Sequence, residues 1–77
     1  MRIVSWNCNG AFRKKYEEII KLDADIYVIQ ECEPIDSFKK ELRKKISNGI
    51  WEKGANTKGV LVFAKPEVKL EKLYVMK

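Results

Sequence analysis

Two polar side chains, an amide and a carboxylate, are the residues of this sequence best suited to chemistry. Asn7 ends a short β-favouring run in WNCNG, residues 6–10, and Glu31 ends a second run in VIQE, residues 28–31. A carboxylate is a hard oxygen donor that suits Mg²⁺ or Mn²⁺. An amide can hydrogen-bond a phosphate oxygen or a metal-bound water without adding charge. The two residue types would therefore suit one site if the fold brings them together.

The segments before these two side chains must position them. Residues 2–8 are rich in branched and aromatic side chains and predict a strand that ends in an Asn-Gly turn. Residues 12–20 carry apolar side chains at helical spacing and predict an amphipathic helix. Residues 26–30 form a continuous β-favouring run, which is typical of a strand covered on both faces in a parallel sheet. Strand, helix and strand within about 30 residues indicate a βαβ unit.

The two parallel strands of a βαβ unit end at the same edge of their sheet. Neighbouring strands lie about 4.8 Å apart, so we expect the side chains of Asn7 and Glu31 to converge there. Open α/β sheets usually bind ligands outside the carboxyl ends of their strands. Taken alone, Glu31 could be an exposed residue or a helix cap, and Asn7 a plain turn residue. Their shared position favours the site.

More elements are expected after Glu31. Their order is a helix that begins near residues 34–37, a strand over 50–53, a strand over 59–65 and, after Pro66, a strand over 67–75. Asp36 or Ser37 would cap the helix, and Asn48-Gly49 would stop it. Its inner stripe would consist of Phe38, Leu42 and Ile46. The fold class expected is thus α/β (α+β), a βαβ unit followed by a helix and an antiparallel hairpin.

Length and composition limit what the protein can be. The chain has 77 residues, 45% hydrophobic and 35% charged, which fits one small globular domain. Sixteen Lys and Arg against 11 Asp and Glu give a net charge of +5, which favours a polyanionic partner or is simply a basic surface. No apolar run approaches the roughly 20 residues that cross a bilayer, so we expect a cytoplasmic protein without membrane contact.

The chain contains two cysteines, Cys8 and Cys32, and no histidine. This set cannot supply a four-ligand zinc site of Cys and His within one chain. In a cytoplasmic protein we expect both thiols to be reduced, as small buried or half-buried side chains. The missing histidine removes the commonest general base near neutral pH.

Three segments resemble the N-terminal portion of the endonuclease/exonuclease/phosphatase superfamily: WNCNG at 6–10, DADIYVIQE at 23–31 and KGVLVFAK at 58–65. That family includes exonuclease III-like DNA-repair nucleases, deadenylases, sphingomyelinases and inositol polyphosphate phosphatases. The resemblance runs in order over nearly the whole chain. It implies a sandwich of two β-sheets flanked by helices and Mg²⁺-dependent hydrolysis of phosphoesters. By the same resemblance, Glu31 binds the metal and Asn7 lines the catalytic site.

The chain departs from the family in length. Family domains are at least about twice as long, and their later half supplies an Asp-x-Asn pair, a further Asp and the histidines. The resemblance therefore implies that residues 1–77 form a single incomplete domain, half of a two-sheet α/β sandwich. The implied function is that of the N-terminal fragment of a Mg²⁺- or Mn²⁺-dependent phosphoester hydrolase, which holds its metal weakly and is inactive alone. Its substrate class (DNA, RNA, lipid or inositol phosphate) is set by loops that this sequence lacks.

Two other functions stay open: a non-enzymatic basic module that binds nucleic acid or phosphate, and a structural fragment. Binding by such a module should fall steeply with added salt. Lys58, beside the loop over 54–57, is one expected phosphate contact. Lys39 and Arg43, on the helix after Glu31, are two more, although such basic helix faces are usually just solvated.

Half of a sandwich leaves one sheet face and one sheet edge without cover. Two helices cannot hide all the branched side chains of the expected strands, such as Val28, Val60 and Val62. Exposed faces and edges promote association. We therefore expect a homo-oligomer that forms through the sheet.

Overall fold

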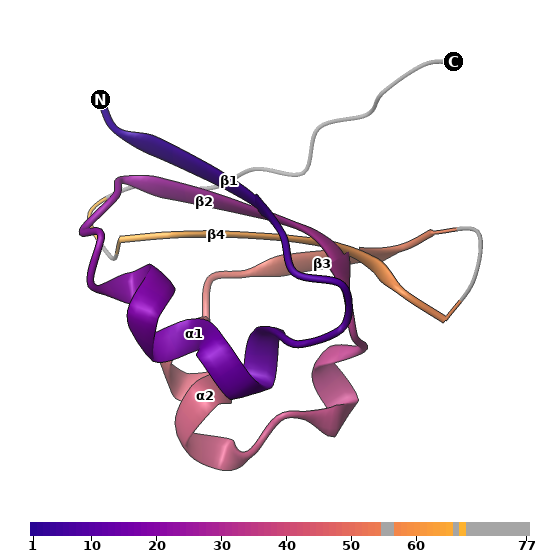
Figure 1. The fold of residues 1–77 in the computed structure, drawn as a ribbon. Coiled ribbons are helices and arrows are strands. Elements are labelled where there is room, and N and C mark those ends of the chain that lie inside the picture. The colour runs from indigo at the N-terminus through magenta and orange to yellow at the C-terminus, as the bar shows by residue number, and fades with distance from the viewer. Residues whose placement is uncertain (55–56, 66, 68–77) are drawn as a thin grey trace.

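The computed structural model of the chain describes residues 1–54, 57–65 and 67 (Figure 1). Its elements in chain order are β1 (Ile3–Asn7), α1 (Phe12–Ile20), β2 (Ile26–Cys32), the 3-10 helix η1 (Ile35–Ser37), α2 (Lys40–Lys45), β3 (Ile50–Lys53) and β4 (Gly59–Ala64). The six elements expected up to residue 65 are therefore present, most of them within two residues of their expected ends. The strand expected over residues 67–75 lies almost wholly outside the described residues.

The strands form one mixed sheet in the order β1-β2-β4-β3. β1 and β2 are parallel neighbours joined through α1, which confirms the βαβ unit. β4 pairs antiparallel with β2 on one side and with β3 on the other. The hairpin of β3 and β4 is thus antiparallel, as expected, and the fold class is confirmed as mixed α and β.

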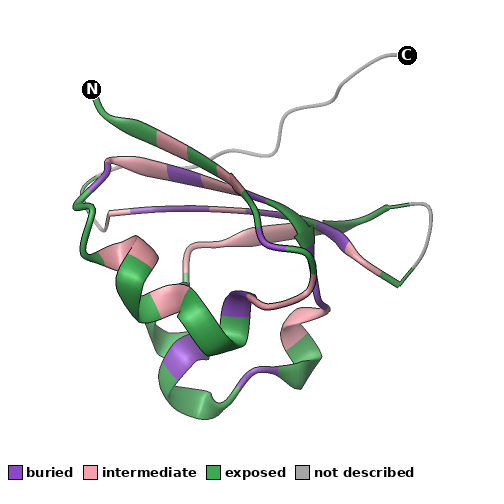
Figure 2. Cartoon of the chain, in the orientation of Figure 1, coloured by how far each residue is buried: buried purple, intermediate pink, exposed green. Residues whose placement is uncertain are grey.

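Both helices cover the same face of the sheet, and the hydrophobic core lies between them and the strands (Figures 1 and 2). Phe12, at the start of α1, is fully buried at the centre of this core. Its ring lies 5.6 Å from that of Phe38 and 5.8 Å from that of Phe63, centroid to centroid. The predicted inner stripe of the second helix is confirmed, since Phe38, Leu42 and Ile46 are all buried.

The other face of the sheet carries a row of branched side chains. Val28 pairs with Val62, and Val62 pairs with Ile50 on the far strand. At the ends of this face, Ile3 is 58% exposed and Val60 is 39% exposed. The described residues place no helix on this side of the sheet. Association of copies through this face stays a prediction.

The second helix differs from the expectation. Instead of one helix from residues 34–37 onward, η1 ends at Ser37 and α2 begins at Lys40, because Phe38 is extended (φ −84°, ψ 144°). The extended backbone allows the Phe38 ring to enter the core beside Phe12. The expected cap is also wrong: the N-cap of α2 is Lys39, which makes no side-chain cap, and the Ser37 hydroxyl donates to the Pro34 carbonyl at 2.6 Å.

The described helices are short. Within the part of the chain that the structure describes, none has the length and apolar character needed to cross a bilayer.

Candidate functional site

Asn7 and Glu31 meet at the carboxyl edge of the two parallel strands. Asn7 is the last residue of β1 and pairs with Gln30 of β2. Its amide Nδ2 donates a hydrogen bond to Oε2 of Glu31, and both residues are exposed. The spatial expectation drawn from the βαβ pattern is confirmed.

A β-bulge aims Glu31 at this edge. The pairing of β2 with β4 shifts between Ile29 and Cys32, and Glu31 has a φ of 50°. Positive φ is uncommon for a residue with a side chain and costs about 1–3 kcal/mol, so such conformations are found mainly where surrounding structure enforces them. Bulges occur often beside binding sites because they redirect a side chain. Here the bulge leaves Gln30 and Glu31 exposed, and the next two residues buried.

The loop after β1 is tied to the bulge by its backbone. The amide of Cys8 donates to the carbonyl of Gln30 at 3.0 Å, and that of Gly10 donates to the carbonyl of Glu31 at 2.8 Å. Asn9 lies between them with a φ of 48°. Its amide donates to Oδ1 of Asn7 at 3.2 Å, which fixes the orientation of the Asn7 side chain. The amide Nδ2 of Asn7 therefore faces Glu31.

Lys58 brings a positive charge to the same place. Its Nζ donates to Oδ1 of Asn9 at 2.9 Å. A Cβ added at Gly10 would lie 3.3 Å from Cε of Lys58, so glycine leaves room for the lysine. Lys58 and Glu31 both line an open hollow of about 560 Å³ between the end of β2 and the start of β4. A carboxylate, an amide and an ammonium group thus lie around one rim.

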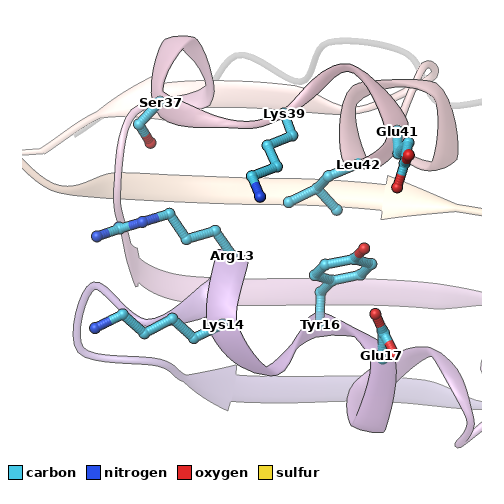
Figure 3. Close-up of a pocket in the computed structure, with 8 residues that line it drawn as sticks. All are labelled: Arg13, Lys14, Tyr16, Glu17, Ser37, Lys39, Glu41 and Leu42. Atoms are coloured by element: carbon cyan, nitrogen blue, oxygen red, sulfur yellow. The ribbon is translucent and has the colours of Figure 1, made fainter.

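Two other predicted phosphate contacts lie elsewhere. Lys39 lines a different groove, of about 490 Å³, where its side chain extends from the start of α2 toward α1 (Figure 3). Arg43 turns back toward η1, where it donates to Oδ1 of Asp36 and to the carbonyl of Ile35, both at 3.3 Å. The structure therefore groups Lys58, and neither Lys39 nor Arg43, with Asn7 and Glu31.

The sequence reading missed Glu33, a buried carboxylate two residues after Glu31. It is 6% exposed. Its Oε1 accepts from the amide of Phe12 at 3.1 Å, and its Oε2 accepts from the amide and from Nη1 of Arg13, both at 3.0 Å. Since Ala11 at the N-cap of α1 has no capping side chain, Glu33 caps this helix from the end of β2.

Two opposing influences act on the pKa of Glu33. Burial raises the pKa. The hydrogen bonds from the backbone of Arg13, of Glu33 itself and of Phe12, together with that from the Arg13 guanidinium, lower the pKa by more than burial raises it. The net effect is a pKa below the ordinary value for a glutamate, so Glu33 is ionised near neutral pH.

Both cysteines lie beside Glu33, and both are free and buried. The two sulfurs and one carboxylate oxygen of Glu33 all lie within 4.8 Å of one another. Burial, and then the charge of Glu33, raise the pKa of Cys32. The prediction of small buried thiols is confirmed. The sequence ECE at 31–33 places a cysteine between two acids, but only the fold shows that Cys32 and Glu33 are both buried.

The rim at Glu31 suits a weakly held hard cation. Its carboxylate is exposed, with one oxygen bonded to an amide that adds no charge. Among the described residues that line the adjoining hollow, Glu31 is the only acid. Mg²⁺ is bound in proteins by one or two carboxylates with several retained waters, so the donor set fits this ion but supplies only part of a strong site.

Comparison with models of known protein families, with curated proteins and with solved structures found no match to this chain.

Proposed function

We propose that this chain is the N-terminal portion of a Mg²⁺-dependent phosphoester hydrolase of the endonuclease/exonuclease/phosphatase type. The observation that carries the proposal is the contact between Asn7 and Glu31 at the carboxyl edge of two parallel strands. The segments on which the resemblance depends supply that edge: WNCNG supplies the amide, VIQE the carboxylate, and the segment from residue 58 the lysine.

Each residue at the rim has a distinct role in this proposal. Glu31 would hold Mg²⁺, or Mn²⁺ in its place, and the ion when bound would neutralise charge on the phosphate and on the leaving oxygen. Asn7 would hold the carboxylate in position and offer a hydrogen bond to a phosphate oxygen. Lys58, held against Asn9 at the same rim, would attract the substrate phosphate as a point charge.

The chain has no histidine, and its rim holds one acid among the described lining residues. Among the described residues that line the rim, none is a histidine or a second carboxylate that could act as a base toward water. We expect no appreciable hydrolysis of a simple aryl phosphodiester by this chain with Mg²⁺. Turnover that Glu31→Ala abolishes would contradict this expectation, and would show that the 77 residues suffice.

Metal binding tests the proposal directly. In a titration of the chain with Mn²⁺, followed by electron paramagnetic resonance of the free ion, Glu31→Gln should weaken binding at least tenfold. Glu18→Gln, which removes an exposed carboxylate on the outer side of α1, is the matched control and should leave binding unchanged. Equal losses in both variants would mean that Mn²⁺ is bound only diffusely, and would refute the assignment of Glu31.

The reading frame provides a second test. If this chain is the first part of a hydrolase domain, the coding sequence should continue past Lys77 and encode the missing acids and histidines. The longer product should then hydrolyse phosphodiesters, and Glu31→Gln should reduce kcat. A longer product that binds Mn²⁺ at Glu31 without hydrolysing any phosphoester would favour the binding function over the enzyme.

The alternative is a basic module that binds phosphate groups without chemistry. Lys58 at the rim and the net charge of +5 favour it. Under this alternative a single-stranded oligonucleotide should bind, and its affinity should fall steeply between low and moderate salt. Binding that does not depend on salt would argue against this function.

A further inference from the structure

Three ligand-type side chains converge below the loop that follows β1. Cys8 directly follows β1, Cys32 ends β2, and Glu33 follows β2. Oε1 of Glu33 lies 3.9 Å from the sulfur of Cys8 and 3.7 Å from the sulfur of Cys32. Cys8, Cys32 and Glu33 are 4%, 0% and 6% exposed, respectively. Two separate strand ends thus bring two thiols and a carboxylate together in the interior.

These spacings suit a tetrahedral metal ion. Zn²⁺ lies about 2.3 Å from thiolate sulfur and about 2.0–2.2 Å from carboxylate oxygen, so ligand atoms on a tetrahedron around it are separated by about 3.5–3.8 Å. The two sulfur–oxygen distances are at or within a few tenths of an ångström of that range. The carbonyl oxygen of Glu31 lies 3.4 Å from the sulfur of Cys8, which is close to the spacing required of a fourth ligand.

The net charge of the buried site does not change when such an ion binds. The charge of Glu33 is already balanced by the guanidinium of Arg13 at 3.0 Å. A divalent ion replaces one proton on each thiol, two thiolates form, and two protons leave to solvent. The added charge of +2 is cancelled by the two thiolates, so the interior remains neutral, as burial requires.

We propose that Cys8, Cys32 and Glu33 form a binding site for a thiophilic divalent cation, with Zn²⁺ as the natural ligand. Two sulfur donors select a soft or borderline ion over Mg²⁺. The site would tie the segment after β1 to the end of β2, next in the chain to Asn7, Asn9 and Glu31. It is separate from the proposed Mg²⁺ position, because it uses different side chains of opposite exposure, and it does not depend on the proposed hydrolase function.

The site is tested on the full chain, reduced and freed of metal, near neutral pH. Titration with Co²⁺ should produce thiolate-to-metal charge-transfer absorption that saturates at one ion per chain, and Zn²⁺ should displace the Co²⁺ and abolish the absorption. Cys32→Ser should lower Co²⁺ affinity at least a hundredfold, and Glu33→Gln about tenfold. Glu18→Gln, which removes an exposed carboxylate of α1, is the matched control and should leave Co²⁺ binding unchanged.

Several results would overturn the site. The site is wrong if the unmutated chain shows no charge-transfer absorption with Co²⁺, or if the absorption saturates at one ion per two chains. Equal losses of Co²⁺ affinity in Glu18→Gln and Glu33→Gln would also overturn the site. Far-ultraviolet circular dichroism checks that each variant is folded. If Cys32→Ser is unfolded, the Co²⁺ titrations of Cys8→Ser and of the unmutated chain are the test of the site. In the unmutated chain Zn²⁺ should also raise the melting temperature, which a site present only in unfolded chains would not do.

Discussion

Glu31 and Glu33 lie two residues apart at the end of β2, yet their surroundings are opposite. Glu31 is exposed, has a positive φ, and has one carboxylate oxygen bonded to the amide of Asn7. Glu33 is buried, and its two oxygens accept from two backbone amides and the guanidinium of Arg13. The first carboxylate is open to solvent, whereas the second is held by the fold and faces two buried thiols.

The bulge at Glu31 is the cause of this difference. In a regular strand residues 31 and 33 would point to the same face of the sheet, because side chains alternate with a period of two. The left-handed residue breaks the alternation, so Glu31 turns to solvent while Cys32 and Glu33 both enter the interior. One strained residue therefore separates an exposed carboxylate from a buried one.

The largest expected effect is on stability. Glu33→Gln should lower the free energy of unfolding by about 2 kcal/mol, because the amide group brings N–H donors against the N–H donors of Phe12 and Arg13 and leaves the guanidinium without its counter-charge. Glu31→Gln should change it by no more than about 0.5 kcal/mol. Urea unfolding measures both values. Equal losses would erase the distinction between the two carboxylates.

Low pH should reduce the contribution of Glu33 to stability. The pKa of Glu33 is lower in the folded chain than in the unfolded one, so its contribution is fully present above its unfolded pKa of about 4.3 and is lost as the pH falls through the folded value. The stability difference between the unmutated chain and Glu33→Gln should therefore narrow from pH 7 to pH 3. A difference that stays constant over this range would mean that Glu33 does not act through its charge.

A glycine at the bulge should increase stability rather than decrease it. Glu31→Gly should raise the free energy of unfolding by about 1 kcal/mol, since glycine adopts positive φ without strain, and should abolish Mn²⁺ binding. Ser5→Gly, at a regular exposed position of β1, is the matched control and should lower stability by about 1 kcal/mol. If both variants are destabilised alike, the conformation of Glu31 is not strained.

The smallest effect concerns the cations beside the two acids. Lys58 is anchored by a hydrogen bond at the exposed rim, whereas Arg13 pairs with the buried carboxylate. Lys58→Gln should weaken binding of a single-stranded oligonucleotide about threefold and lower the salt slope by about 1, with stability changed by less than about 0.5 kcal/mol. Fluorescence anisotropy at several salt concentrations measures both. Lys15→Gln, on the exposed side of α1, should have a smaller effect, and an equal one would show that the chain binds by net charge alone.

Much of the site could be predicted from the sequence because it depends on strand direction. Asn7 and Glu31 follow two strongly β-favouring runs joined by a clear helix, and parallel strands must end at one edge. The position of Lys58 at the rim depends in addition on the antiparallel pairing of β4 with β2, which the residue pattern does not specify.

Glu33 could not be predicted because its position depends on a broken pattern. Counting alternate residues from Ile29 would place residues 31 and 33 on the buried face together, and a bulge is not visible in residue types. The end of η1 has a similar explanation. Helical spacing correctly identified Phe38 as a core residue. Its ring reaches Phe12 from an extended backbone, however, and not from a continuous helix.

Glu33 also has a consequence for how the chain can form during synthesis. The first amides of α1 are capped by a side chain that the ribosome adds about twenty residues later. Until that segment has left the exit tunnel of the ribosome, the first amides of α1 lack their hydrogen-bond acceptors, and a helix this short is not stable by itself. The first strand, the first helix and the second strand must therefore become ordered as one cooperative unit, late rather than stepwise.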